Sequence, residues 1–184
     1  ADMLTERIRQ LPEATTALLQ LAACLGNTVT LAELAEAAGV DVVEAGRRVG
    51  PALEAGHLLP LGRGHRWLVD GDAPTDELEA LRLRFLHDRV QQAAYTLLDE
   101  GDRQPIHLAI GRRIAGADPR GARLFGATRH FGAAEVLIVD PGERDAVAAL
   151  HLAAARQAPA SNAHGPARVL LDRGLRLASE PAVL

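Results

Sequence analysis

Three short amphipathic stretches near the N-terminus, each with its own start signal, constrain the fold of this chain most strongly. The first begins at Pro12 and repeats apolar side chains at helical spacing. Thr30 with Glu33 forms a capping-box pattern before the second, and Asp41 with Glu44 repeats the pattern before the third. A glycine closes each stretch, at Gly26, Gly39 and Gly56. Helices this short with tight glycine turns predict a three-helix core of the helix-turn-helix type.

Two short apolar runs, His57–Leu61 and Arg66–Val69, follow the helices on either side of a Gly-Arg-Gly turn. They predict a β-hairpin, with Leu81–Leu86 as a candidate third strand. The segment Asp70–Glu79 between them is rich in Asp, Pro and Gly and is expected to be a mobile loop. A three-helix core followed by a small β-hairpin predicts a winged-helix domain over residues 1–100.

The second half of the chain has the pattern of successive amphipathic helices. Asp88 is expected to cap the first of them, with Gln91 at the third helical position as its partner. The helices expected after it span Asp102–Ile114, Ala122–Ala134, Glu143–Ala158 and Ala163–Leu177. Prolines fall at or near their borders, and the connections are short. We therefore expect antiparallel, TPR-like helical hairpins over residues 101–184, although no clean internal period is present. The expected fold class is mainly α.

Composition excludes several classes of function. Every basic residue is Arg, and a Walker A loop needs a lysine, so this chain holds no standard one and is not expected to be an enzyme in isolation. A net charge of -4 and a pI near 6.0 disfavour nucleic acid as a partner. No apolar run reaches the roughly 20 residues of a membrane span, and the single cysteine, Cys24, fits a reducing compartment. We expect a cytoplasmic protein with no membrane partner and a buried thiol.

The remaining polar residues predict neither a metal site nor a catalytic triad. His107 lies beside the apolar stripe of Ile106 and Ile110 and is expected to be structural. His130, His151 and His164 are too far apart in sequence for a compact set of metal ligands. No Gly-x-Ser-x-Gly elbow is present. We expect no catalytic and no metal-binding residues.

The segment Phe85–Tyr95 places a His-Asp pair where a short apolar strand gives way to an amphipathic helix. Together with Arg103 and the stretch Ile106–Gly111, it resembles the region that follows the nucleotide-binding domain in STAND-type signalling ATPases. The likeness is to large bacterial sensor kinases that carry such an ATPase module. The later stretch Leu150–Leu177 is similar to the helical repeats of that family. The absence of an initiator methionine and the abrupt end at Leu184 indicate a piece excised from a longer protein.

The resemblance implies a role for His87. In that family the winged-helix domain packs on the ATPase core, and the His of a Met-His-Asp-like motif reaches the β-phosphate of bound ADP. Leu86-His87-Asp88 looks like this motif, with Leu in place of Met. An imidazole beside the positive end of a helix suits a phosphate. The alternative is that His87 is merely a solvated residue at the start of a helix, and Asp88 needs only its capping role.

What the resemblance implies is a non-catalytic regulatory segment of a larger ATP-binding STAND protein, fused to a protein kinase domain. Its winged helix would sense the nucleotide and couple that state to a helical interaction array. The segment itself would hold no cofactor, because ATP or ADP would be bound by the ATPase core, its expected partner, while other proteins would bind the helical region. A DNA-binding winged-helix transcription regulator and a generic helical protein-interaction module remain as alternatives. The mixed charges of the helix that begins after Asp41 disfavour the first.

Overall fold

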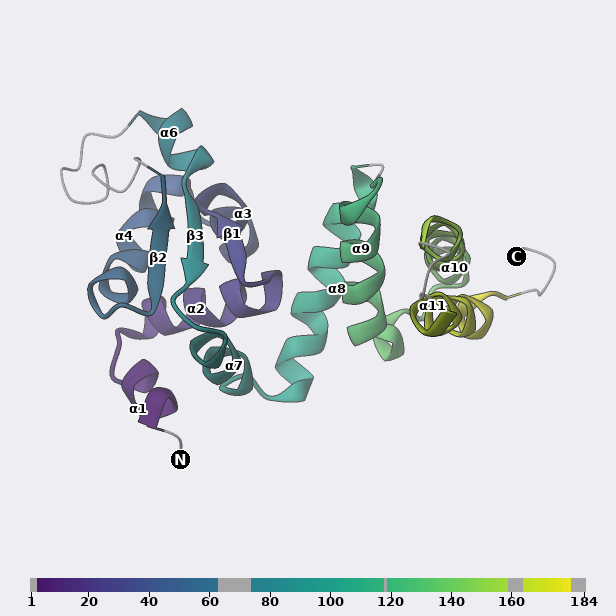
Figure 1. Ribbon diagram of the computed structural model, residues 1–184, viewed down its shortest axis with the longest axis horizontal. Helices are drawn as coiled ribbons and strands as arrows, with labels where there is room; N and C mark the ends of the chain where they lie inside the picture. Colours follow the sequence, from purple (N-terminus) through teal and green to yellow (C-terminus); the bar gives the residue numbers. More distant parts are fainter. Residues whose placement is uncertain (1–2, 63–73, 118, 159–163, 180–184) are drawn as a thin grey trace. The chain divides into compact units, whose positions relative to one another are not determined.

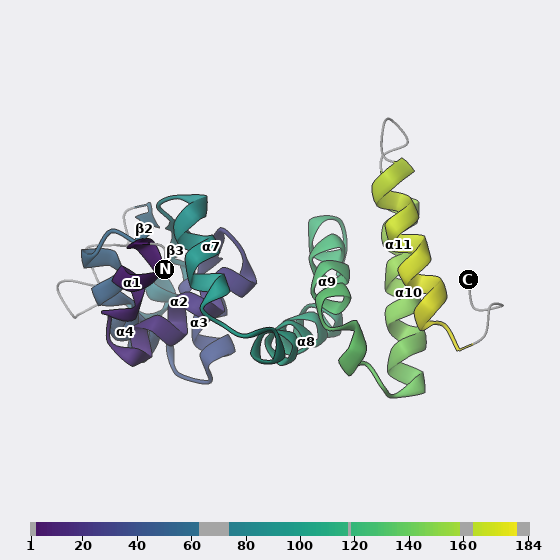
Figure 2. The same ribbon diagram turned by 90° about the horizontal axis from the view of Figure 1, so that it is seen from below.

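A computed structural model of the protein describes residues 3–62, 74–117, 119–158 and 164–179 (Figure 1, Figure 2). The chain divides into two compact units, Ala1–Asp99 and Glu100–Leu184. Most of the described residues are helical, and one small antiparallel sheet accompanies them. The expectation of a mainly helical protein is thereby confirmed. No helix within the described ranges is both long enough and apolar enough to cross a membrane.

The three predicted N-terminal helices are present as α2 (Glu13–Leu25), α3 (Leu31–Ala38) and α4 (Val42–Glu54). The predicted capping box at Thr30 is confirmed, whereas Asp41 makes only the first of the two capping-box bonds, because the Glu44 carboxylate bonds Arg47 and Arg48 instead. The Glu33 amide donates to Thr30 Oγ1 at 3.1 Å, while the Thr30 amide donates to the Glu33 carboxylate at 2.9 Å. The Asp41 side chain accepts from the Glu44 amide at 2.8 Å. These bonds satisfy amide groups that a helix leaves unpaired at its first turn.

Two further helices of the first unit were not predicted. A short helix α1 (Met3–Arg9) precedes α2, and only its Ile8 is buried, which leaves almost no periodic signal in the sequence. Helix α6 (Thr75–Ala80) lies in the segment expected to be a loop, so the loop prediction for Asp70–Glu79 is wrong over these residues. Buried Leu78 anchors this turn, and the packing of that side chain outweighs the loop-like composition around it.

The sheet contains β1 (Thr28–Thr30), β2 (Leu58–Leu61) and β3 (Arg82–Phe85), in the order β1-β3-β2, with both pairs antiparallel. The candidate third strand is therefore the central one, and β1 was missed altogether. The predicted strand Arg66–Val69 lies outside the described residues. One face of the sheet is buried, and the strands lie in front of α3 and α4 in Figure 1. The buried strand residues are Val29, Leu58, Leu83 and Phe85.

Helix α7 (Asp88–Thr96) follows β3 and completes the first unit. It buries Val90, Ala93 and Ala94, and the Gln91 side chain donates to the Ala23 carbonyl of α2 at 3.2 Å. The apolar cores of the sheet and the helices are continuous. Because β3 and α7 both contribute to this core, the short junction between them is fixed at both ends.

The second unit consists of α8 (Glu100–Gly116), α9 (Ala122–Ala133), a 3-10 turn η2 (Glu135–Leu137), α10 (Pro141–Gln157) and α11 (His164–Leu177). Helix α8 packs against α9, and α10 packs against α11. Figure 1 shows α8 beside α9, and Figure 2 shows α10 beside α11. The four predicted helices are confirmed, and only α8 extends clearly beyond its predicted range. Their shared core includes Leu108, Ala127, Phe131, Ile138, Val147 and Leu177.

Candidate functional site

The junction between β3 and α7 holds the residue singled out by the sequence. His87 occupies the N-cap position of α7 in extended conformation, with φ -144° and ψ 149°. Its carbonyl accepts from the Val90 amide at 2.9 Å, while its side chain makes no capping bond. The imidazole is exposed, as are the side chains of Leu86 and Asp88. The structure thus places His87 at a rigid strand-to-helix junction with its ring accessible from outside the unit.

The predicted capping role of Asp88 is wrong. Asp88 is the first residue of α7, and the extended residue before it fills the cap position. Gln91, its expected partner, instead bonds the Ala23 carbonyl. The reason is that the extended backbone continues through His87, so the helix begins one residue later than its sequence signal indicates. At the first helical position the Asp88 carboxylate is still stabilised by the positive end of the helix.

Two backbone donors accompany the His87 imidazole. The amides of Asp88 and Arg89 open α7 and have no hydrogen-bond acceptor among the described residues. Free amides at a helix start, next to an imidazole, form an arrangement that can hold the oxygens of a phosphate. Sequence reasoning found the imidazole but missed these amides, because their position depends on where the helix begins.

A second cluster of polar side chains lies inside the second unit. The Nδ1 atoms of His107 on α8 and His130 on α9 are 2.9 Å apart, and both side chains are buried. Burial and the neighbouring Arg129 lower the pKa of both rings, that of His130 to about 3. His107 thus has the structural role that the sequence predicted. Its partner, His130, could not be identified from sequence spacing. When both rings are neutral, the Nδ1 of one ring donates its proton to the Nδ1 of the other. This hydrogen bond links α8 to α9.

The other buried histidines also have structural environments. His57 is 3% exposed, and burial followed by the charge of Arg7 lowers its pKa. His151 Nδ1 donates to the Val147 carbonyl at 2.9 Å, and its Nε2 has no hydrogen-bond partner among the described residues. Burial is the main cause of the lowered pKa of His151. Across the described part of the chain, no group of three His, Cys, Asp or Glu side chains converges as metal ligands do.

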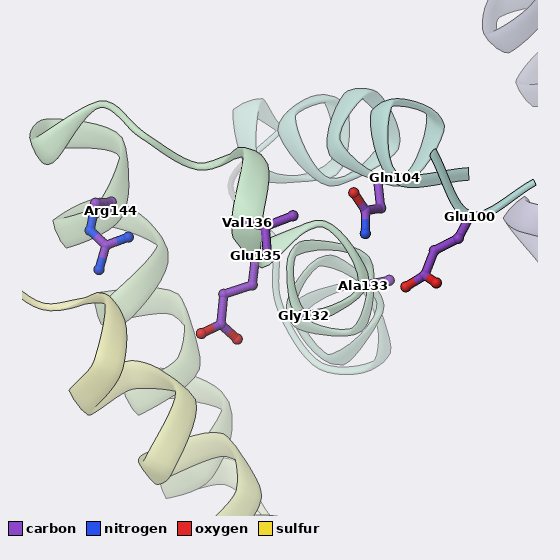
Figure 3. A pocket seen from close by; sticks show the side chains of 7 residues that line it. All are labelled: Glu100, Gln104, Gly132, Ala133, Glu135, Val136 and Arg144. Atoms are coloured by element: carbon purple, nitrogen blue, oxygen red, sulfur yellow. The ribbon is translucent and has the colours of Figure 1, made fainter. Parts of the chain in front are cut away.

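A pocket of about 450 Å³ lies in the second unit between α8, the end of α9 and the start of α10 (Figure 3). Glu100 and Gln104 line one side and Arg144 the other. The pocket's charged groups are largely occupied: Glu135 accepts two bonds from Arg176, and Arg144 donates to the Ile138 and Arg176 carbonyls. No residue that the sequence singled out lines this pocket. Its polar groups mainly bond other parts of the second unit, so they stabilise the connections between helices and are not arranged for a ligand.

Helix α4 carries the adjacent basic pair that a DNA-reading helix would use. Glu44 accepts from Arg47 at 2.7 and 2.6 Å and from Arg48 at 2.6 Å. These bonds lower the pKa of Glu44 to about 2, so the carboxylate stays ionised at any ordinary pH. One acid thereby offsets part of the positive charge of this face, which agrees with the mixed charge noted in the sequence.

No protein-family model matches the sequence, and neither a curated protein nor a solved structure is significantly similar to this chain.

Proposed function

We propose that this chain is a non-catalytic regulatory segment of a larger ATP-binding protein of the STAND type, in which the first unit senses the bound nucleotide. The observation that carries the proposal is the β3–α7 junction. There the exposed His87 imidazole lies beside the free amides of Asp88 and Arg89. Such donors suit the β-phosphate of ADP presented by an ATPase core. The proposed parent also carries a protein kinase domain and works in the cytoplasm.

The arrangement of the first unit supports a winged-helix assignment. Three helices, α2, α3 and α4, precede the antiparallel pair β2 and β3, which corresponds to a helix-turn-helix core followed by a wing. In the second unit, α8 with α9 and α10 with α11 form consecutive packed pairs, which supports a TPR-like interaction array. Both assignments are part of the proposal and agree with the sequence resemblance.

The proposed mechanism is a shift between two populations of the parent protein. When ADP is bound, His87 contacts its phosphate, and this contact favours a closed state with the first unit docked on the ATPase core. Exchange for ATP removes that preference and favours an open state, in which the helical pairs of the second unit are free to bind protein partners. A nucleotide shifts such an equilibrium only as far as its affinities for the two states differ.

The proposal is tested by ADP release from the parent protein. We expect His87→Ala to accelerate the dissociation of a fluorescent ADP analogue by roughly tenfold or more, because one hydrogen bond to a charged group is lost. Arg89→Ala is the matched control, since it truncates an exposed side chain of the same helix while the amide stays in place. Equal dissociation rates for wild type and His87→Ala would leave His87 as a solvated helix-start residue only.

A further inference from the structure

The face of the sheet that points away from the core carries two rows of side chains that run across the three strands. Strand pairing places Thr28, Arg84 and Leu59 side by side in one row across the three strands. It places Thr30, Arg82 and Leu61 in the next row. Directly opposed residues share a face of an antiparallel sheet, so these six side chains form one surface, which we name the outer sheet face. Figure 1 looks onto this side of the sheet.

Among the residues that the structure describes, no acidic side chain pairs with the two arginines of the outer sheet face. Arg82 and Arg84 are exposed, and neither side chain makes an ion pair or a hydrogen bond among the described residues. The Glu33 carboxylate, which follows β1 on α3, is held by the amide and hydroxyl of Thr30. Elsewhere the described arginines often have acidic partners, as Arg47, Arg112 and Arg176 do. Within the described part of a chain of net charge -4, these two unpaired guanidinium groups therefore give this face a local positive charge.

Apolar side chains lie beside these charges. Leu59 and Leu61 on β2 are only half-buried and stand next to Arg84 and Arg82. A guanidinium group forms planar paired bonds with a carboxylate, and an adjacent leucine offers apolar contact area to a protein side chain. A nucleic acid backbone would use the arginines but not the leucines, and the overall negative charge of the chain opposes it.

We propose that the outer sheet face is a docking surface for an acidic protein segment in extended conformation. Arg82 and Arg84 are two residues apart on one strand, which separates their Cα atoms by roughly 7 Å. Carboxylates at alternate positions of an extended segment have the same spacing and also point to one side. Such a segment pairs each carboxylate with one guanidinium, while the methylene groups of the same acidic side chains contact Leu59 and Leu61. This surface is separate from the His87 junction and does not depend on its role.

The test is peptide binding to the whole 184-residue chain, measured by fluorescence anisotropy. The probe is a fluorescein-labelled peptide of eight residues that alternates Glu and Thr, and the control peptide has Gln in place of Glu. We expect the acidic peptide to bind and its Gln version to bind about tenfold more weakly. Arg82→Gln with Arg84→Gln should weaken binding of the acidic peptide by the same factor. Arg9→Gln with Arg47→Gln, which removes equal charge from α1 and α4, should leave binding within about twofold.

Charge reversal provides an independent readout. Arg82→Glu with Arg84→Glu should lose the acidic peptide and gain binding of a peptide that alternates Lys and Thr. The proposal is overturned if neither the acidic peptide nor its Gln version binds the wild-type chain at about 1 mM, a weak-affinity limit. The same holds if the control variant at Arg9 and Arg47 loses as much affinity for the acidic peptide as the variant at Arg82 and Arg84. It is also overturned if a labelled 20-base-pair DNA duplex binds more tightly than the acidic peptide and depends on the same two arginines, which would make the face a nucleic-acid surface.

Discussion

His107 and His130 are joined inside the second unit by a bond between their Nδ1 atoms, which lie 2.9 Å apart. The ring centroids are 5.1 Å apart. For the bond to form, one ring must carry its proton on Nδ1 while the other leaves Nδ1 free to accept. The pair thus links α8 to α9 through two neutral rings of opposite tautomer. Arg103, Arg113 and Arg129 face these rings and oppose their protonation.

This pair makes the stability of the second unit depend on pH. The pKa of both rings lies below the ordinary value of 6.5 in the folded state, that of His130 at about 3. The unfolded chain therefore binds more protons than the folded chain below pH 6.5. Stability is fully present above that pH. It falls by about 1.4 kcal/mol per pH unit for His130 as the pH drops toward about 3, and His107 adds to the loss until its own lowered pKa is reached. Urea unfolding of the chain between pH 8 and pH 5, followed by circular dichroism, measures this loss.

The double variant His107→Leu with His130→Leu is the control for this prediction. Removing both rings leaves neither Nδ1 atom of the pair unpaired, and the contact that Arg129 loses with His130 Nε2 is long at 3.4 Å, so stability at pH 8 should change little. The dependence on pH should weaken, with His57 and His151 accounting for what remains. An unchanged pH dependence in the double variant would assign the acid sensitivity to other groups.

Gly111 on α8 permits the close packing of α9. A Cβ atom at this position would lie 3.2 Å from the Phe131 ring, tighter than ordinary packing contacts. Gly111→Val should therefore destabilise the chain by about 1–3 kcal/mol through overpacking. Gly101→Ala on the same helix is the control, because a Cβ there meets nothing within 4 Å. Thermal unfolding compares the two, and equal midpoints would show that α8 and α9 are not held at this distance.

Binding to duplex DNA should be weak and independent of sequence. Glu44 engages both Arg47 and Arg48, and Glu54 adds a second acid, so α4 carries no net positive charge toward a phosphate backbone. Electrophoretic mobility shift at physiological salt should detect no complex at submicromolar concentration, and Glu44→Gln should increase binding only modestly. A salt-resistant, sequence-selective complex at that concentration would favour the transcription-regulator alternative instead.

The isolated chain should not hydrolyse ATP. It has no lysine and therefore no standard Walker A loop to hold the phosphates. A phosphate-release assay on the purified chain should give the background rate at all ATP concentrations. Steady turnover that a single substitution within the chain abolishes would contradict the non-catalytic assignment.

Local sequence signals predicted most of the helices, although not the short α1 and α6, and they did not predict contacts between residues distant in sequence. Thr30 and Glu33 are neighbours on one turn, so their capping box could be predicted from spacing alone. Strand β1, with only three residues, is defined by pairing with β3 far along the chain, and no local pattern marks it. The bond between His107 and His130 likewise depends on how α8 packs on α9. The position of His87 between a strand and a helix could be predicted because the two sequence patterns meet there. The residue at which the helix begins could not be predicted, because the extended backbone continues through His87.

The most direct test of the regulatory role is the accessibility of His87 in the nucleotide-bound parent protein. Diethyl pyrocarbonate modifies exposed imidazoles, and mass spectrometry reports the modified residue. His87 is exposed in this chain, while His57 and His151 are buried and serve as internal references. If His87 contacts the phosphate of ADP, saturating ADP should slow its modification strongly relative to the nucleotide-free parent, with the references unchanged. Modification of His87 at the same rate with and without ADP would contradict the proposed nucleotide contact.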